Sequence, residues 1–268
     1  MNRWCSAVVA GLLALALQCP AATLQPTDDP AASEVWLKVR TSLFEGRPVQ
    51  PAPAGWLQLE VPARAVDAAV VPLAMRATLP EGQHVARLIL VIDANPSPIS
   101  GLFRFPLAPA RAELQTRVRV DAYSWVRAIV ETTDGRLYGT TKFVKASGGC
   151  SAPAGGDAAE ALAGMGRMNL RIDGRPEGPE PVTLQLAIRH PNHSGMAMDQ
   201  ASRQFTPSHF VRTVNVTVDG KPVFEADVDF SISENPNFRF PVTTPLPAQG
   251  QVRDRKSTRL NSSHTDIS

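Results

Sequence analysis

Cysteine and helical periodicity are both scarce in this 268-residue chain. Two of the three cysteines, Cys5 and Cys19, fall in a segment that we expect to be removed, which leaves Cys150 alone in the mature chain. A single cysteine excludes an internal disulfide framework and leaves either a reactive thiol or an intermolecular link. Long amphipathic helical patterns are nearly absent, whereas 24 prolines and short runs of β-branched residues are present, so the sequence predicts an all-β fold.

An excess of charge of one sign is lacking as well. The formal net charge is +2 at pH 7, and it falls to about zero when Arg3 and the tail from Asp254 are set aside. We therefore expect no nucleic-acid partner, which would require a basic surface. No Ser-His-Asp set or metal-ligand set suggests independent turnover, so the sequence predicts neither an enzyme nor a bound cofactor.

Residues 1–22 have the order of a secretory signal. Arg3 precedes an apolar run over Ala7–Leu17, and small residues follow up to Ala22. Such a run is too short to span a bilayer, so we expect cleavage near Ala22, export to the periplasm and no membrane anchor. A lipoprotein anchored at Cys19 is the less favoured alternative, because Gln18 stands where a small residue would be expected.

The region 28–145 predicts a helix followed by one β-sandwich. The helix is expected over Asp28–Leu43, with Asp29 as its cap and Pro30 at its first position, and the proline-rich Gly46–Gly55 is expected to be a connector. Seven short strands in about 90 residues suggest an immunoglobulin-like sandwich, with the last two strands forming a hairpin. They are expected at 56–61, 70–78, 87–93, 102–106, 112–120, 125–132 and 136–144.

The region 167–252 predicts a second, similar sandwich, preceded by a short helix over Asp157–Leu162. Its strands are expected at 168–172, 182–189, 211–218, 223–230 and 238–242. The halves share a motif: Asn95-Pro96 precedes Phe103–Pro106, and Asn235-Pro236 precedes Phe238–Pro241. The predicted fold is therefore all-β, with two immunoglobulin-like β-sandwich domains of similar topology and a short N-terminal helix.

The end of the chain departs from this pattern. After Pro241 come a proline-rich stretch and the segment RDRKSTRLNSSHTDIS, residues 253–268, which has neither strand alternation nor a hairpin. We interpret this segment as a non-native tail, since it resembles translated vector sequence, and a natural disordered tail is the alternative. In both cases we expect the second sandwich to be truncated and its edge to be open.

Cys150 stands in the segment KASGGCSAPAGG, residues 145–156, at the junction of the two halves. Its neighbours are small, and such a segment cannot bury a sulfur by itself, so the sequence predicts an exposed, reactive thiol. A buried cysteine that behaves as a small hydrophobe is the alternative. We expect the linker 146–166 to be flexible through Gly148, Gly149, Gly155 and Gly156.

Several motifs resemble those of the SoxY and SoxZ families. They are FVKASGGC, which ends at Cys150, and, in the second half, Arg189-His190-Pro191, Pro207–Val211, Val218–Val223 and Ser231–Pro236. On these motifs the chain resembles a fused SoxY and SoxZ pair, the sulfur-carrier complex of the periplasmic thiosulfate-oxidising system. It is most similar to the SoxYZ-like carrier proteins encoded beside quinoprotein dehydrogenases. The resemblance covers the mature chain up to about Thr244.

The resemblance implies a carrier that holds sulfur intermediates covalently on Cys150 while separate proteins act on them. Its expected partners are sulfur-oxidising periplasmic enzymes or a quinoprotein dehydrogenase. Its SoxY-like and SoxZ-like halves are expected to pair within the chain, because tethering raises their effective concentration. One departure is that the cysteine of SoxY lies at the free carboxyl end, whereas Ser151 and Pro153 follow it here and tether the segment at both ends.

Two other functions stay open from the residues alone. A copper chaperone is the first, because imidazole and thioether groups suit copper, although the same loop could be polar with incidental methionines. The candidate ligands are His190, His193, Met196 and Met198. A non-catalytic adaptor of a quinoprotein dehydrogenase is the second, but it leaves Cys150 unexplained.

Overall fold

The computed structural model describes residues 25, 28–107, 109–153, 155, 163–174, 181–199, 202–218, 220–242 and 250–254. The predicted signal segment 1–22, the predicted helix over Asp157–Leu162 and the tail from Arg255 lie outside this part of the chain. Within the described ranges, no helix has both the length and the apolar character needed to cross a membrane.

The described residues form fourteen strands, and the predicted all-β fold is confirmed. The first half contains β1 (Val49–Pro51), β2 (Leu57–Glu60), β3 (Val71–Thr78), β4 (Val85–Ile92), β5 (Ile99–Arg104), β6 (Arg111–Val118), β7 (Ser124–Thr132) and β8 (Leu137–Val144). The second half contains β9 (Met168–Asp173), β10 (Val182–Ile188), β11 (Thr213–Val218), β12 (Lys221–Val228), β13 (Asn237–Val242) and β14 (Gly250–Asp254). Every predicted strand is present, and β7 and β8 form the predicted hairpin.

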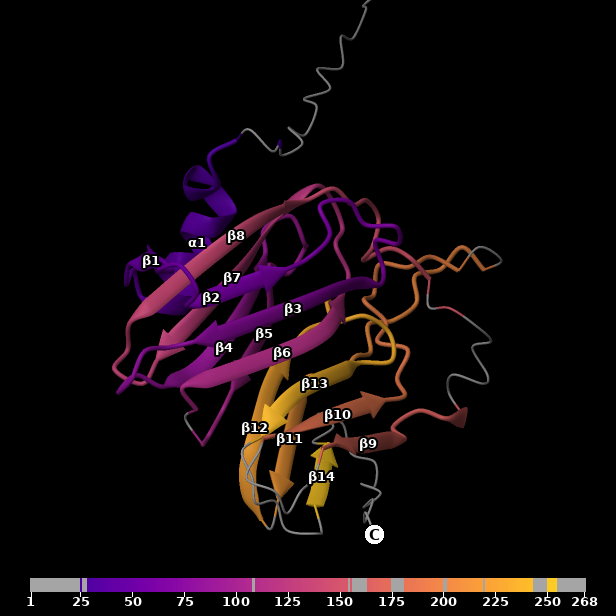
Figure 1. Ribbon diagram of the computed structural model, residues 1–268. Coiled ribbons are helices and arrows are strands. Elements are labelled where there is room, and N and C mark those ends of the chain that lie inside the picture. The colour runs from indigo at the N-terminus through magenta and orange to yellow at the C-terminus, as the bar shows by residue number, and fades with distance from the viewer. Residues whose placement is uncertain are drawn as a thin grey trace, which may run out of the picture.

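Both sheets run through both halves of the chain. The larger has the order β1-β8-β7-β4-β5-β12-β11-β14, and the smaller has the order β2-β3-β6-β13-β10-β9. The halves meet where β5 pairs antiparallel with β12 and where β6 pairs antiparallel with β13. Figure 1 shows the result, two sandwiches joined edge to edge. Each half thereby covers a strand edge that the other would leave unpaired.

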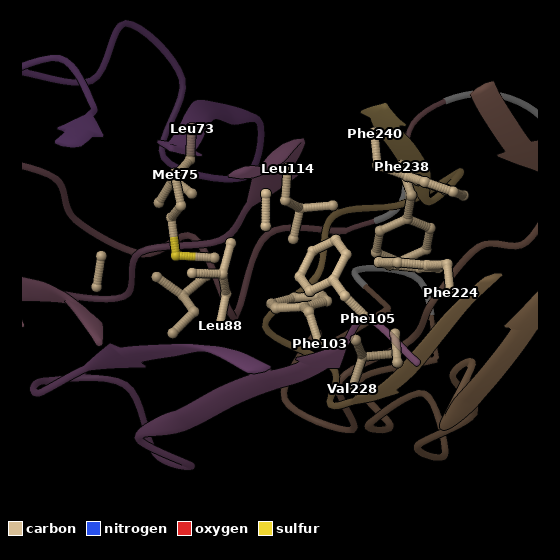
Figure 2. Packing of buried hydrophobic residues seen from close by; sticks show 14 of the residues in the cluster. Leu73, Met75, Leu88, Phe103, Phe105, Leu114, Phe224, Val228, Phe238 and Phe240 are labelled. Atoms are coloured by element: carbon tan, nitrogen blue, oxygen red, sulfur yellow. The ribbon is translucent and has the colours of Figure 1, made fainter. Parts of the chain in front are cut away.

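One hydrophobic core crosses this join (Figure 2). The ring of Phe103, on β5, lies 6.3 Å from that of Phe224, on β12, and 6.3 Å from that of Phe238, on β13, between centroids. Phe224 in turn stacks on Phe240 at 4.1 Å, and all four rings are buried. The two Phe-Arg-Phe-Pro motifs that repeat in the sequence therefore lie on opposite sides of the join and pack through their phenylalanines.

The N-terminal helix forms where it was predicted, as a 3-10 helix, η1 (Pro30–Ala32), followed by α1 (Glu34–Phe44). The Asp29 side chain caps η1 and the Ser33 side chain caps α1, as expected for short polar residues at helix starts. The apolar face of α1 packs against buried side chains of β4, β7 and β8. Its buried residues are Trp36, Val39 and Phe44.

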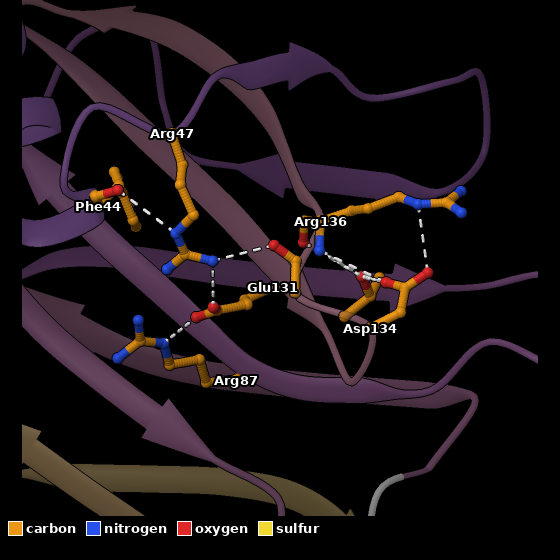
Figure 3. Close-up of polar contacts among 8 residues, drawn as sticks. Phe44, Arg47, Arg87, Glu131, Asp134 and Arg136 are labelled. Atoms are coloured by element: carbon orange, nitrogen blue, oxygen red, sulfur yellow. Dashed lines mark hydrogen bonds and ion pairs between the residues drawn. The ribbon is translucent and has the colours of Figure 1, made fainter.

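A carboxylate of β7 anchors the end of α1 to the larger sheet (Figure 3). Glu131 accepts a hydrogen bond from Arg47 Nη1 at 2.8 Å and a second from Arg87 Nε on β4. Arg47 also donates to the carbonyls of Phe44 and Gly135, at 3.3 and 2.9 Å. The turn after α1 is thus held to both β4 and the β7–β8 hairpin by charge-assisted hydrogen bonds.

Two strands were not predicted. β1 lies in the expected proline-rich connector and pairs parallel with β8. β14 follows the proline-rich stretch and pairs antiparallel with β11, so the expectation that no strand follows Pro241 is wrong. Both are edge strands whose pairing depends on a remote partner strand, and neither has the alternation that marks a strand in sequence.

Replacing Phe224 by Ala should destabilise both halves together. The ring is fully buried, and deleting such a side chain costs about 3–5 kcal/mol of unfolding free energy. Because the core is shared, urea unfolding followed by near-UV and far-UV circular dichroism should stay a single transition at a lower midpoint. Phe205→Ala is the matched control, since that ring is 61% exposed. Two separated transitions, or an unchanged midpoint, would contradict a shared core.

Candidate functional site

Cys150 lies after β8, where the two halves meet, and it is fully buried. The predicted exposure of this thiol is therefore wrong. Its sequence neighbours Ser147 and Ser151 are exposed, in contrast to the cysteine. The cover comes from residues that are distant in the sequence.

Hydrogen bonds from both halves hold the backbone of residues 148–150. The N–H groups of the two glycines donate to the carbonyls of Asp121 and Val120, at 2.6 and 3.2 Å. The N–H of Cys150 donates to the Asp121 carboxylate at 3.1 Å, and the Ser194 hydroxyl donates to the carbonyl of Cys150 from the second half. The segment is closed over its cysteine by contacts on both sides.

Close packing explains why glycine stands before the cysteine. A Cβ at Gly149 would lie 2.1 Å from the carbonyl oxygen of Ala68 and 2.6 Å from that of Val120, which no side chain can tolerate. Gly148 has a φ of +76°, in the left-handed region that favours glycine. The expected flexibility of the linker stays a prediction for Gly148, Gly149 and Gly155, and Gly156 lies outside the described residues.

Arg119, just after β6, is a buried cation beside this segment. Its side chain reaches into the second half, where Nη1 donates to the carbonyls of Asn192, Phe230 and Ile232 at 2.8, 2.8 and 2.9 Å. Burial lowers the pKa of Arg119, an effect that negative charge on Cys150 opposes. Arg119 therefore both links the halves and carries a positive charge into the surroundings of the thiol.

Asn95 organises the backbone around Arg119. Its Nδ2 donates to the carbonyl of Arg119 at 2.9 Å and to the hydroxyl of Ser231 at 3.0 Å, while its Oδ1 accepts the N–H of Asp121 at 2.9 Å. Asn95 belongs to the Asn-Pro motif that the sequence repeats, so a sequence signal existed for this residue. No such sequence signal marked Arg119, Asp121 or Ser194, because their roles depend on contacts between the halves.

The surroundings keep the Cys150 thiol protonated. Burial, with a smaller contribution from the negative charge of Asp121, raises its pKa to about 12, and the positive charge of Arg119 opposes this. The thiolate is the nucleophilic form of cysteine. In this closed arrangement Cys150 is therefore covered and chemically quiet at neutral pH.

The proposed copper ligands lie in contrasting environments. His190 is buried, and its Nδ1 accepts the N–H of Asn192 at 2.9 Å. His193 and Met196 are half-buried, whereas Met198 is exposed. Burial, followed by the positive charge of Arg119, lowers the pKa of His193. Among the described residues, no group of three or more His, Cys, Asp or Glu side chains could hold a metal ion, and the copper hypothesis stays a prediction.

Comparisons with known proteins match two families, one in each half. The model of "Sulfur oxidation protein SoxY" matches residues 40–150, and that of "Sulphur oxidation protein SoxZ" matches residues 173–263. A solved structure of the sulfur carrier protein SoxY from Chlorobium limicola f thiosulfatophilum is 22% identical over 41% of this chain and 89% of its own, with a TM-score of 0.33. No curated protein sequence matches the chain.

Gly149→Ala should expose the thiol. An added Cβ cannot fit against the Ala68 and Val120 carbonyls, so the segment must move away from them, and maleimide should label Cys150 in the folded protein faster than in the wild type. Wild-type labelling should be slow until denaturant is added. Ser147→Ala, at an exposed neighbour, is the matched control. Fast labelling of the folded wild type, or no acceleration in the variant, would contradict the closed arrangement.

Alkaline pH should weaken the wild type more than Cys150→Ala. The pKa of Cys150 in the folded protein, about 12, lies above that of an unfolded thiol, so the folded state holds the proton more tightly. This difference stabilises the folded state in full below about pH 8.5, where the unfolded thiol is also protonated. As the pH rises above about 8.5, the wild type should lose up to about 1.4 kcal/mol of unfolding free energy per pH unit relative to the variant. Urea titrations from pH 7 to 10.5 under reducing conditions measure this, and parallel pH profiles would exclude it.

Proposed function

Because the chain belongs to the SoxY and SoxZ families of sulfur-oxidation proteins, whose domains it joins in one polypeptide, we propose that it is a covalent sulfur carrier with Cys150 as the attachment point. The observation that carries the proposal is the position of this cysteine. Cys150 is the last residue of the SoxY match, and its carbonyl accepts a hydrogen bond from Ser194 in the SoxZ half. A thiol so placed can hold cargo at the boundary of the two domains.

The carrier works by alternating between a closed and an open segment. In the closed form, hydrogen bonds of residues 148–150 with Asp121, Val120 and Ser194 hold the segment where the thiol is buried. Breaking these few hydrogen bonds lets the segment swing outward, where the thiol regains an ordinary pKa and reacts as a thiolate. Because the segment continues into the SoxZ half, it opens as a loop tethered at both ends.

Partner enzymes supply the chemistry in this proposal. They attach a sulfur intermediate to the open thiol, oxidise it and release it by hydrolysis, while the carrier contributes the attachment and the delivery. The partners are sulfur-oxidising periplasmic enzymes or a quinoprotein dehydrogenase. Export through the signal-like residues 1–22 would bring the carrier into the periplasm with them.

Protein isolated from its host should contain a fraction with added sulfur-containing mass on Cys150. Intact-mass spectrometry should find this mass, and reductant should remove it, as expected for a persulfide or thiosulfonate linked through sulfur. The Cys150→Ala variant should carry no such mass, and neither protein alone should consume thiosulfate. If native protein from cells grown on thiosulfate, other reduced sulfur compounds or alcohols shows no adduct, the carrier function is wrong.

A further inference from the structure

Arg119 is a buried cation whose charge is not balanced by any carboxylate at ion-pair distance among the described residues. It is 3% exposed, and its hydrogen-bond partners are backbone carbonyls. Its Nε has no hydrogen-bond partner in the part of the chain that the structure describes. An unpaired buried charge is strongly unfavourable, and a buried N–H donor without an acceptor adds to that cost. Arg119 would therefore be stabilised in any state of the protein that places an anion beside its guanidinium.

Cys150 is the group beside Arg119 on which an anion can be placed. Val120 and Asp121, the two residues after Arg119, accept the N–H groups of residues 148–150. On the other side, Arg119 Nη1 donates to the carbonyl of Asn192, and Ser194, two residues later, donates to the carbonyl of Cys150. In keeping with this placement, Arg119 and Cys150 each shift the pKa of the other toward its charged form. The remaining charges near the thiol are negative, since Asp121 and Asp229 both raise its pKa. Of the charged groups that shift the pKa of the thiol, Arg119 is the one that favours a negative charge there. His193 and Glu234, the other titratable groups that interact with Arg119, lie on the SoxZ side.

Resting on the carrier function proposed above, we propose that Arg119 is the anion-binding residue for cargo on Cys150 and favours sulfur chains that end in a sulfonate. A thiosulfonate on Cys150 carries a permanent negative charge and three acceptor oxygens. It would supply both the counter-charge and the acceptor that the Arg119 guanidinium lacks, through charge-assisted hydrogen bonding. Loaded protein then closes over anionic cargo more firmly than over neutral cargo of similar size.

Two loading reactions give matched adducts, and in each the S–S reagent is itself the oxidant of the thiolate. The Cys150 thiolate attacks a central sulfur of tetrathionate, forming Cys–S–S–SO₃⁻ and breaking the central S–S bond, and thiosulfate leaves with the electron pair. With bis(2-hydroxyethyl) disulfide, the same thiolate forms the neutral Cys–S–S–CH₂CH₂OH and 2-mercaptoethanolate leaves. Both reactions are run on the mature chain, in urea below its unfolding transition so that the segment opens, and the urea is then removed.

The measurement is the release of each adduct by dithiothreitol, followed by intact mass. Dividing the rate in denaturant by the rate in the folded protein gives a protection factor that removes the intrinsic reactivity of each adduct. In the wild type, the anionic adduct should be protected at least about tenfold more than the neutral one, as one charge-assisted hydrogen bond would give. In Arg119→Met this ratio should fall to one or below, because Asp121 and Asp229 then repel the anion.

Arg117→Met is the matched control, because this arginine is exposed and lies on β6 two residues earlier, and it should leave the ratio unchanged. Arg119→Lys should retain part of the preference. If Arg119→Met does not fold, the wild type still decides, since equal protection of the two adducts overturns the inference. That result is distinct from failure of the carrier function, which would appear as native protein without any adduct on Cys150.

Discussion

The antiparallel pairing of β5 with β12 is the interaction on which the rest of the structure depends. It carries the larger sheet from one half into the other, and β6 with β13 does the same for the smaller sheet. Because both sheets cross the join, Phe103, Phe224 and Phe238 share one core that neither half could close alone. Domains of two sequence families are thereby joined through continuous sheets and one core.

The same join creates the surroundings of the cysteine. Asp121 and Arg119 come from the SoxY half, whereas Ser194 and the carbonyls that accept from Arg119 come from the SoxZ half. Both halves hold the segment that carries the buried thiol, and the fused chain keeps them at a high effective concentration. The surroundings of the cysteine are therefore complete only when the two halves are joined.

A stored sulfur intermediate and a reactive thiolate need opposite environments. Burial and Asp121 keep an empty Cys150 protonated and quiet, while the charge of Arg119 stabilises an anion at the same place. In the proposed carrier, the closed position therefore serves two states: the empty protein hides a thiol there, and the loaded protein holds a charged cargo. Gly149 serves both, because only glycine lets the backbone pack against Ala68 and Val120.

The sequence by itself determined the families and the described strands other than β1 and β14, and it singled out Cys150 as the proposed attachment residue. The period-two alternation of strands such as Val182–Ile188 is local, and the motif around Cys150 needs no tertiary information. Only the tertiary structure decided how the halves join, that β1 and β14 are strands, and that Cys150 is buried. The small residues around Cys150 cannot cover its sulfur, but they let groups that are remote in the sequence approach closely. Val120 and Ser194 are two such groups, and they come together at the segment only when both sheets are complete.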